Sequence, residues 1–142
     1  MKQFGIAASA LLLVATSTWS QLAPPQRLAP NDVKSGTTVG SIDLGPIFPQ
    51  MQGYVLMERL TTVAPGFGMP WHSHAGRPEI MRVLSGTLTD ARDGGPPKTY
   101  GVGSTLINDG KTRHTWANLG SEQLVLLSAT VLPSNAVNQL PK

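Results

Sequence analysis

The sequence contains no cysteine, which excludes disulfide bonds and a cysteine nucleophile. Stability must then come from core packing and from any bound metal. Carboxylates are also scarce: 8 Asp and Glu residues accompany 11 Lys and Arg residues in a chain of 142, which explains the basic pI of about 9.6. The basic residues are scattered singly, without a stripe or interleaved aromatic residues. We therefore expect one domain of ordinary size with no nucleic-acid partner.

Long apolar runs are absent as well, since no stretch approaches the roughly 20 residues that a membrane-spanning helix needs. Residues 1–20 instead have the pattern of an export signal peptide, with Lys2 as the charged start and an apolar stretch from Phe4 to Ala15. The small residues Thr18 and Ser20 favour cleavage after Ser20. We expect an exported protein, periplasmic or secreted, that has no membrane contact after cleavage. An uncleaved membrane anchor is the alternative.

No segment shows a sustained helical period. Residues 21–52 are rich in Pro, Gly, Ser and Thr, and we interpret them as a linker that leads into a short N-terminal edge strand. From residue 53 to residue 132, short runs rich in Val, Leu, Thr and Ile alternate with turn clusters, which is typical of an antiparallel barrel or sandwich. Residues 133–142 form a polar tail, for which a short helix, an edge extension and disorder all stay open. The predicted strands are Tyr54–Val63, Met69–His74, Glu79–Ala91, Lys98–Tyr100, Thr105–Ile107, His114–Asn118 and Gln123–Leu132.

All 3 histidines fall into one pattern with a glutamate. Alternate side chains of a strand share a face, so His72 and His74 point the same way, about 7 Å apart along the strand. Glu79 follows a turn and starts the next strand facing inward, and His114 arrives from a distant strand. Two histidines alone could equally be hydrogen-bonded side chains without a metal, but the register with Glu79 and His114 favours ligation. We predict a metal site formed by His72, His74, Glu79 and His114 that leaves coordination positions free for a guest molecule.

The same residues resemble the first motif of the cupin superfamily. That motif has a glycine, five residues, His-X-His, three or four residues, Glu, six residues and a second glycine. Gly66, His72, His74, Glu79 and Gly86 match each marked position in turn.

The second cupin motif is recognisable from Gly103 through His114 to Asn118. One departure occurs where the family has Pro-X-Gly, because this chain has Asp109, Gly110 and Lys111. The departure puts the turn before His114 in doubt but leaves the register of the histidine intact.

The resemblance implies an all-β fold, a small antiparallel jelly-roll (cupin) β-barrel in a single domain over residues 53–132. It also implies a homodimer, because cupin barrels often dimerise through edge strands that would otherwise be unpaired.

The parity of the strands predicts the lining of the pocket. Residues that share the inward face with Glu79 and His114 include Met81, Val83 and Trp116, which would form an apolar cup around the metal. The alternative for these three is plain core packing. No acid or base beside the metal is evident, since Asp90 is expected to make local hydrogen bonds at a turn.

Two functions follow from such a site. The first is a metalloenzyme that acts on a small oxygen-bearing molecule as a dioxygenase, decarboxylase, isomerase or lyase, with an oxidoreductase of dioxygenase type favoured. The second is a metal-dependent binding or scavenging protein without turnover. The cofactor is one divalent transition metal: Mn or Fe(II) is favoured by the mixed nitrogen and oxygen ligands, and Zn, Ni or Cu would also bind.

Overall fold

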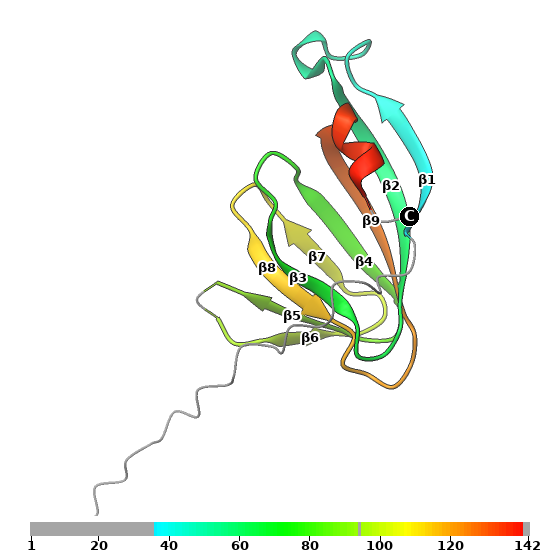
Figure 1. Cartoon of the computed structure of the whole chain (residues 1–142), viewed down its shortest axis with the longest axis vertical. Coiled ribbons are helices and arrows are strands. Elements are labelled where there is room, and N and C mark those ends of the chain that lie inside the picture. The colour runs from blue at the N-terminus through cyan, green and yellow to red at the C-terminus, as the bar shows by residue number, and fades with distance from the viewer. Residues whose placement is uncertain (1–35, 94, 141–142) are drawn as a thin grey trace, which may run out of the picture.

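The computed structural model describes residues 36–93 and 95–140, which form two antiparallel β-sheets (Figure 1). The predicted strands appear with small shifts at their ends, except where noted below. Within the described residues, no helix has the length and apolar character needed to cross a membrane. The strands are β1 (Gly36–Asp43), β2 (Tyr54–Val63), β3 (Gly68–Ser73), β4 (Glu79–Ser85), β5 (Leu88–Arg92), β6 (Lys98–Tyr100), β7 (Thr105–Asn108), β8 (Arg113–Ala117) and β9 (Leu124–Pro133), with short 3-10 helices η1 (Pro49–Met51) and η2 (Ser134–Gln139).

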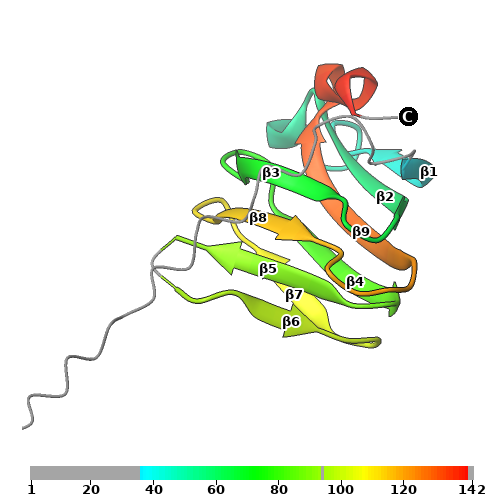
Figure 2. The ribbon, with the colours of Figure 1, turned by 60° about the horizontal axis from the view of Figure 1, so that its bottom comes forward.

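The two sheets face each other as the layers of a flattened barrel (Figure 2). The larger sheet has the strand order β1-β2-β9-β4-β7, and the smaller sheet has the order β3-β8-β5-β6. Neighbours in the sheets are mostly distant in sequence, as in β2 with β9 and β3 with β8. The expected all-β jelly-roll is thereby confirmed.

The core lies between the sheets and follows the alternation of the strands. In β4, Met81 and Val83 are buried, whereas Ile80 and Arg82 face outward. Burial of each large apolar side chain contributes about 1.5–3 kcal/mol to folding. The buried cluster consists of Val63, Met81, Val83, Leu88, Leu106, Trp116, Leu124 and Leu126.

The single strand predicted over residues 79–91 is wrong, because the chain turns at Gly86 and passes from one sheet to the other. Gly86 has a φ of 71°, and a Cβ there would lie 2.7 Å from the carbonyl oxygen of Gln123. Glycine is therefore required on both conformational and steric grounds. The turn makes β4 and β5 separate strands in different sheets, and it shifts the inward parity from odd-numbered to even-numbered residues.

The N-terminal edge strand is longer than the short strand that we expected after the linker. β1 spans 8 residues and pairs with β2 from Gly36 opposite Thr61 to Asp43 opposite Val55. The stretch between Pro30 and Pro46 contains no proline, so its backbone N–H groups are available to pair. In the predicted tail, residues 134–139 form η2. The predicted signal peptide, residues 1–20, lies outside the described residues.

Candidate metal centre

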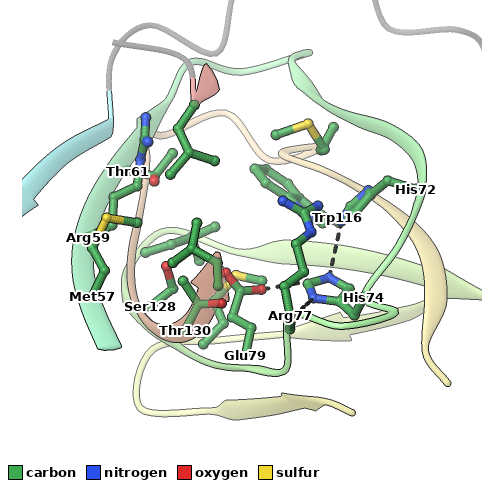
Figure 3. Close-up of a pocket in the computed structure, with 15 residues that line it drawn as sticks. Met57, Arg59, Thr61, His72, His74, Arg77, Glu79, Trp116, Ser128 and Thr130 are labelled. Carbon is green, nitrogen blue, oxygen red and sulfur yellow. Dashed lines mark hydrogen bonds and ion pairs between the residues drawn. The ribbon is translucent and has the colours of Figure 1, made fainter. Parts of the chain in front are cut away.

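The three histidines converge at one end of the smaller sheet. His72 in β3 and His114 in β8 are direct partners in the strand register, and His74 follows β3 immediately. Their Nε2 atoms form a small triangle, with sides of 3.2 Å (His72 to His74), 2.9 Å (His74 to His114) and 3.0 Å (His114 to His72). Figure 3 shows His72 and His74 turning toward one another at the cavity wall. We refer to these three residues as the histidine triad.

Each imidazole of the triad uses its other nitrogen to donate a hydrogen bond to an oxygen. The Nδ1 of His72 lies 2.8 Å from the Pro70 carbonyl, and that of His74 lies 3.2 Å from the Arg77 carbonyl. The Nδ1 of His114 lies 2.6 Å from Oδ1 of Asp90. Carbonyl and carboxylate oxygens only accept, so the proton of each neutral ring resides on Nδ1. Three Nε2 lone pairs therefore point at one another, an arrangement that is repulsive unless a cation lies among them.

The donor set fits a transition-metal ion. Bonds of about 2.0–2.1 Å from a metal to imidazole nitrogens, set at right angles, place neighbouring nitrogens about 3 Å apart, whereas tetrahedral bonds place them about 3.4 Å apart. The observed separations of 2.9–3.2 Å match the first arrangement more closely. The triad is also the group of described residues whose ligand atoms lie close enough to hold an ion. Its residues can therefore bind a metal through three neutral imidazoles.

The predicted fourth ligand, Glu79, lies beside this group and not within it. It begins β4 in the opposite sheet, and its Oε2 is 3.8 Å from the Nε2 of His74. The same oxygen accepts a 3.0 Å hydrogen bond from Nδ2 of Asn108. The structure thus brings the carboxylate to the edge of the triad and holds it there through Asn108.

A hydrogen-bonded chain links Glu79 to His114 through residues that the sequence did not indicate. Arg92 donates from Nε to Asp90 at 2.7 Å and from Nη2 to Oδ1 of Asn108 at 2.8 Å. Asp90 in turn accepts from His114, and Asn108 donates to Glu79. The expectation that Asp90 serves a local turn is wrong: it is buried within β5, and it orients a triad imidazole. We refer to Asp90, Arg92 and Asn108 as the support network.

Burial dominates the electrostatics of the triad. It lowers the pKa of His72 to about 4, with the neighbouring imidazoles and Arg77 acting in the same direction against the hydrogen bond to Pro70. Burial also lowers the pKa of His74, against the opposing effect of Glu79. His72 therefore stays neutral, and ready to ligate, at pH values well below the ordinary range of histidine near 6.5, and the lowered pKa of His74 acts in the same direction.

The pKa of the Asp90 carboxyl group is lowered in spite of its burial. Burial by itself raises the pKa of Asp90, but hydrogen bonds from His114 and Arg92 outweigh it and hold that pKa below its usual value. Asp90 is therefore an anion beside His114, which suits a ligand that must carry its proton on Nδ1.

Two residues of the triad, His72 and His74, line a cavity of about 100 Å³ between the sheets (Figure 3). Of the residues predicted to line it, Met81 and Trp116 do so, whereas Val83 is fully buried in the core cluster away from the cavity. Sequence reasoning missed the cationic side chains Arg59 and Arg77 in the wall. Other lining residues are Met57, Thr61, Met69, Leu126, Ser128, Thr130, Leu132 and Leu140.

Comparison with known proteins decides the family. A family model described as a cupin domain matches residues 59–130, about half of the chain. The chain belongs to the cupin family. No curated protein matches it.

Solved structures agree with the cupin fold. An uncharacterized conserved protein with a double-stranded β-helix domain from Klebsiella pneumoniae subsp. pneumoniae is 18% identical, with a TM-score of 0.56, over 82% of this chain and 93% of that one. A predicted oxalate decarboxylase from Thermotoga maritima is 16% identical, with a TM-score of 0.52, over 74% and 97%. The Schizosaccharomyces pombe Cnp3 cupin domain is 13% identical, with a TM-score of 0.50, over 59% of this chain and 60% of that one, so this chain spans less than two thirds of that length. At these identities the likeness shows the fold alone.

The departure from the second cupin motif has a structural solution. Oδ1 of Asp109 accepts hydrogen bonds from the backbone N–H of Lys111 at 2.9 Å and from Oγ1 of Thr112 at 3.0 Å. The turn made in this way delivers the Thr112 carbonyl to the backbone N–H of His74 at 2.9 Å. Asp109 thus stabilises the turn that a proline forms in the usual motif. The same turn connects the loop before β8 to the first cupin motif.

Proposed function

We propose that this chain is an exported cupin whose histidine triad holds one divalent transition metal, and that it is a metalloenzyme acting on a small oxygen-bearing molecule. The observation that carries the metal site is the convergence of three Nε2 lone pairs within 2.9–3.2 Å, while every Nδ1 donates to an oxygen. Only a cation makes this arrangement favourable. The reaction is of the dioxygenase, decarboxylase, isomerase or lyase type, with a dioxygenase favoured.

Mn or Fe(II) suits the mixed ligands best, and Zn, Ni or Cu would also bind. A divalent ion at this place supplies Lewis-acid polarisation of a bound oxygen atom. The protein supplies the rest of the site. The support network keeps His114 oriented and Glu79 at the edge of the triad, and Met69, Met81 and Trp116 restrict water around the guest.

A binding protein without turnover remains the second candidate, and one observation favours it. Among the described residues that line the cavity, Glu79 is the single carboxylate, and it is already held by Asn108. The site therefore offers little acid or base chemistry beyond the metal and its ligands.

The metal content of protein purified from its native compartment tests the metal site. We expect about one ion per chain in the wild type and a strong loss in His114→Ala. Because Glu79 lies outside the triad, Glu79→Ala should lose less metal than His114→Ala. If the wild type and both variants carry equally little metal, the metal proposal fails.

A substrate panel then separates the two candidates. Oxygen consumption and product formation with diketones, catechols, flavonols and oxalate should reveal turnover that is lost in His114→Ala. Tight retention of a small molecule with no turnover across the panel would favour the binding protein.

Export and dimerisation are further parts of the proposal. Mass analysis of the mature protein should find Gln21 as its first residue, as cleavage after Ser20 predicts. A homodimer is supported by the exposed apolar side chains of Ile80 and Ile107, which pair across β4 and β7 on the outer face of the larger sheet. Light scattering of the purified protein should give twice the mass of one chain.

A further inference from the structure

We propose that the cavity selects a small carboxylate, and that the guanidinium of Arg77 binds this carboxylate beside the metal while a second oxygen of the same molecule reaches the triad. The inference rests on the proposed metal site, and it names the class of substrate or ligand for that site. Arg77 would then be a specificity-determining residue in the gap between His74 and Glu79.

Both backbone polar groups of Arg77 form hydrogen bonds with His74. Its N–H donates to the carbonyl of His74 at 2.9 Å, and its carbonyl accepts from Nδ1 of His74 at 3.2 Å. From this turn the side chain of Arg77 extends into the cavity between the histidines and Trp116 (Figure 3). The backbone of Arg77 is thus held beside the metal site by the same turn that orients His74.

The guanidinium of Arg77 has no anion to bind within the described residues. It is half-buried, and it forms no hydrogen bond or ion pair there, although it has five N–H donors. Its positive charge is felt at the triad, where it contributes to lowering the pKa of His72 and His74. A cation held in a cavity beside a second cationic centre is destabilised unless a ligand brings negative charge.

The available carboxylate of the protein does not fill this role. Glu79 accepts from Asn108 and lies 3.8 Å from the Nε2 of His74, so it is committed to the triad side of the cavity. A carboxylate on the guest is the natural partner of the planar guanidinium fork, because the two groups form paired, charge-assisted hydrogen bonds.

The remaining walls restrict the guest further. The volume of about 100 Å³ is room for about seven to ten water molecules, at roughly 10–15 Å³ each. The hydroxyl groups of Thr61 and Ser128 and a second guanidinium, that of Arg59, line the wall opposite Arg77 (Figure 3). A compact hydroxy acid, keto acid or dicarboxylate matches this volume and these polar groups.

Calorimetric binding of matched probes tests the inference. The wild type, loaded with the ion that it retains best, is titrated with lactate, with its neutral analogue lactamide and with malonate. We expect lactate to bind at least about 10-fold more tightly than lactamide, and Arg77→Gln to weaken lactate binding roughly 10- to 100-fold without changing lactamide binding. Arg77→Lys should recover part of the loss, because it keeps the charge but not the fork. Arg82→Gln, on the outer face of β4, is the matched control and should bind as the wild type does.

The metal content of every variant is measured alongside, so that the two proposals fail separately. If Arg77→Gln holds full metal and still prefers lactate over lactamide, the carboxylate inference is overturned and the metal site stands. If Arg59→Gln abolishes the preference and Arg77→Gln does not, the anion site belongs to the opposite wall and the inference is again overturned.

If the wild type binds no metal, the proposed function fails, and the thermal shift of the metal-free protein with malonate becomes the deciding measurement. Stabilisation by malonate that is lost in Arg77→Gln supports the carboxylate site. Equal or absent stabilisation in both proteins overturns it.

Discussion

Asp90 accepts a 2.6 Å hydrogen bond from His114 at a position where both side chains are almost completely buried. The two residues belong to paired strands, β5 and β8, and Arg92 donates a hydrogen bond to the other carboxylate oxygen of Asp90. This contact fixes the proton of His114 on Nδ1 and leaves Nε2 for a metal. Carboxylates in this position raise the basicity of a ligating imidazole.

Asp90→Asn should lower metal affinity about 10- to 100-fold, the usual effect of removing an outer partner of a metal-ligating histidine. The measurement is competition with a chelator of known affinity at neutral pH. Asp93→Asn is the matched control, because Asp93 is exposed and its ion pair with Arg113 spans 3.6 Å at the surface. Equal affinity in the two variants would show that Asp90 has no influence on the site.

Arg92→Lys should destabilise the metal-free protein by about 1–3 kcal/mol, because an ammonium group cannot bond to both Asp90 and Asn108 as the guanidinium does. Urea unfolding measures the change. Arg113→Lys removes only an exposed contact and should cost less than about 0.5 kcal/mol. If the two substitutions cost the same, the support network has no special role in stability.

Acid should destabilise the metal-free protein as the pH falls below about 6.5, the ordinary pKa of histidine. Unfolded histidines have a pKa of about 6.5, whereas burial lowers the pKa of folded His72 to about 4 and also lowers that of His74. Below pH 6.5 the unfolded chain therefore binds protons that the folded chain does not, and stability falls as the pH drops toward 4. Above pH 6.5 these groups contribute no pH dependence.

Denaturant unfolding at pH 7.5, 6.0 and 5.0 measures this loss. His72→Asn removes one of the titrating groups, so its stability should fall less steeply over the same interval. The lowered pKa of Asp90 affects stability only at pH values below the range in which an ordinary aspartate titrates. It therefore does not affect the comparison between pH 7.5 and 5.0. A wild type of constant stability between pH 7.5 and 5.0 would contradict the burial of the histidines.

Gly86→Ala should cost more than the ~1–2 kcal/mol of a left-handed alanine alone, because the new Cβ also meets the backbone at Gln123. Gly53→Ala is the control, since Gly53 has a φ of 82° with no atom within 4 Å of the added Cβ. Thermal or urea unfolding compares the two. Equal losses would mean that the backbone at Gln123 moves away freely.

The position of the histidine triad could be predicted from the sequence because it depends on local rules. His72 and His74 share a strand face by alternation, and the two motif spacings align β3 with β8 so that His72 meets His114. The regular spacing of short strands and turns predicted an antiparallel barrel or sandwich, and the resemblance to the two cupin motifs implied the jelly-roll. Glu79 was placed on the correct strand, but its 3.8 Å separation from His74 depends on Asn108, to which no motif points.

Asp90 was missed because it was assigned to the turn that follows, whereas the chain turns earlier, at Gly86, and Asp90 lies within β5. Odd-numbered residues face inward in β4, but after the turn the buried residues of β5 include Leu88 and Asp90. Two signals were available in the sequence. Gly86 stands at a motif position and indicates a turn, and Leu88 and Asp90 alternate, which places them on one face of a strand. Arg77 had no such signal, since its direction is set by the turn that binds His74 and not by strand parity.

The predicted metal ligands come from both layers of the barrel. His72 and His114 belong to the smaller sheet, whereas Glu79 begins β4 in the larger one, so the reach of the carboxylate depends on how thick the barrel is at that point. Met81 and Leu126 help to set that thickness from within the core. If Glu79 joins the histidine triad around the proposed ion, the preferred ionic radius should respond to the volume of these apolar residues, and metal selectivity would depend on hydrophobic packing.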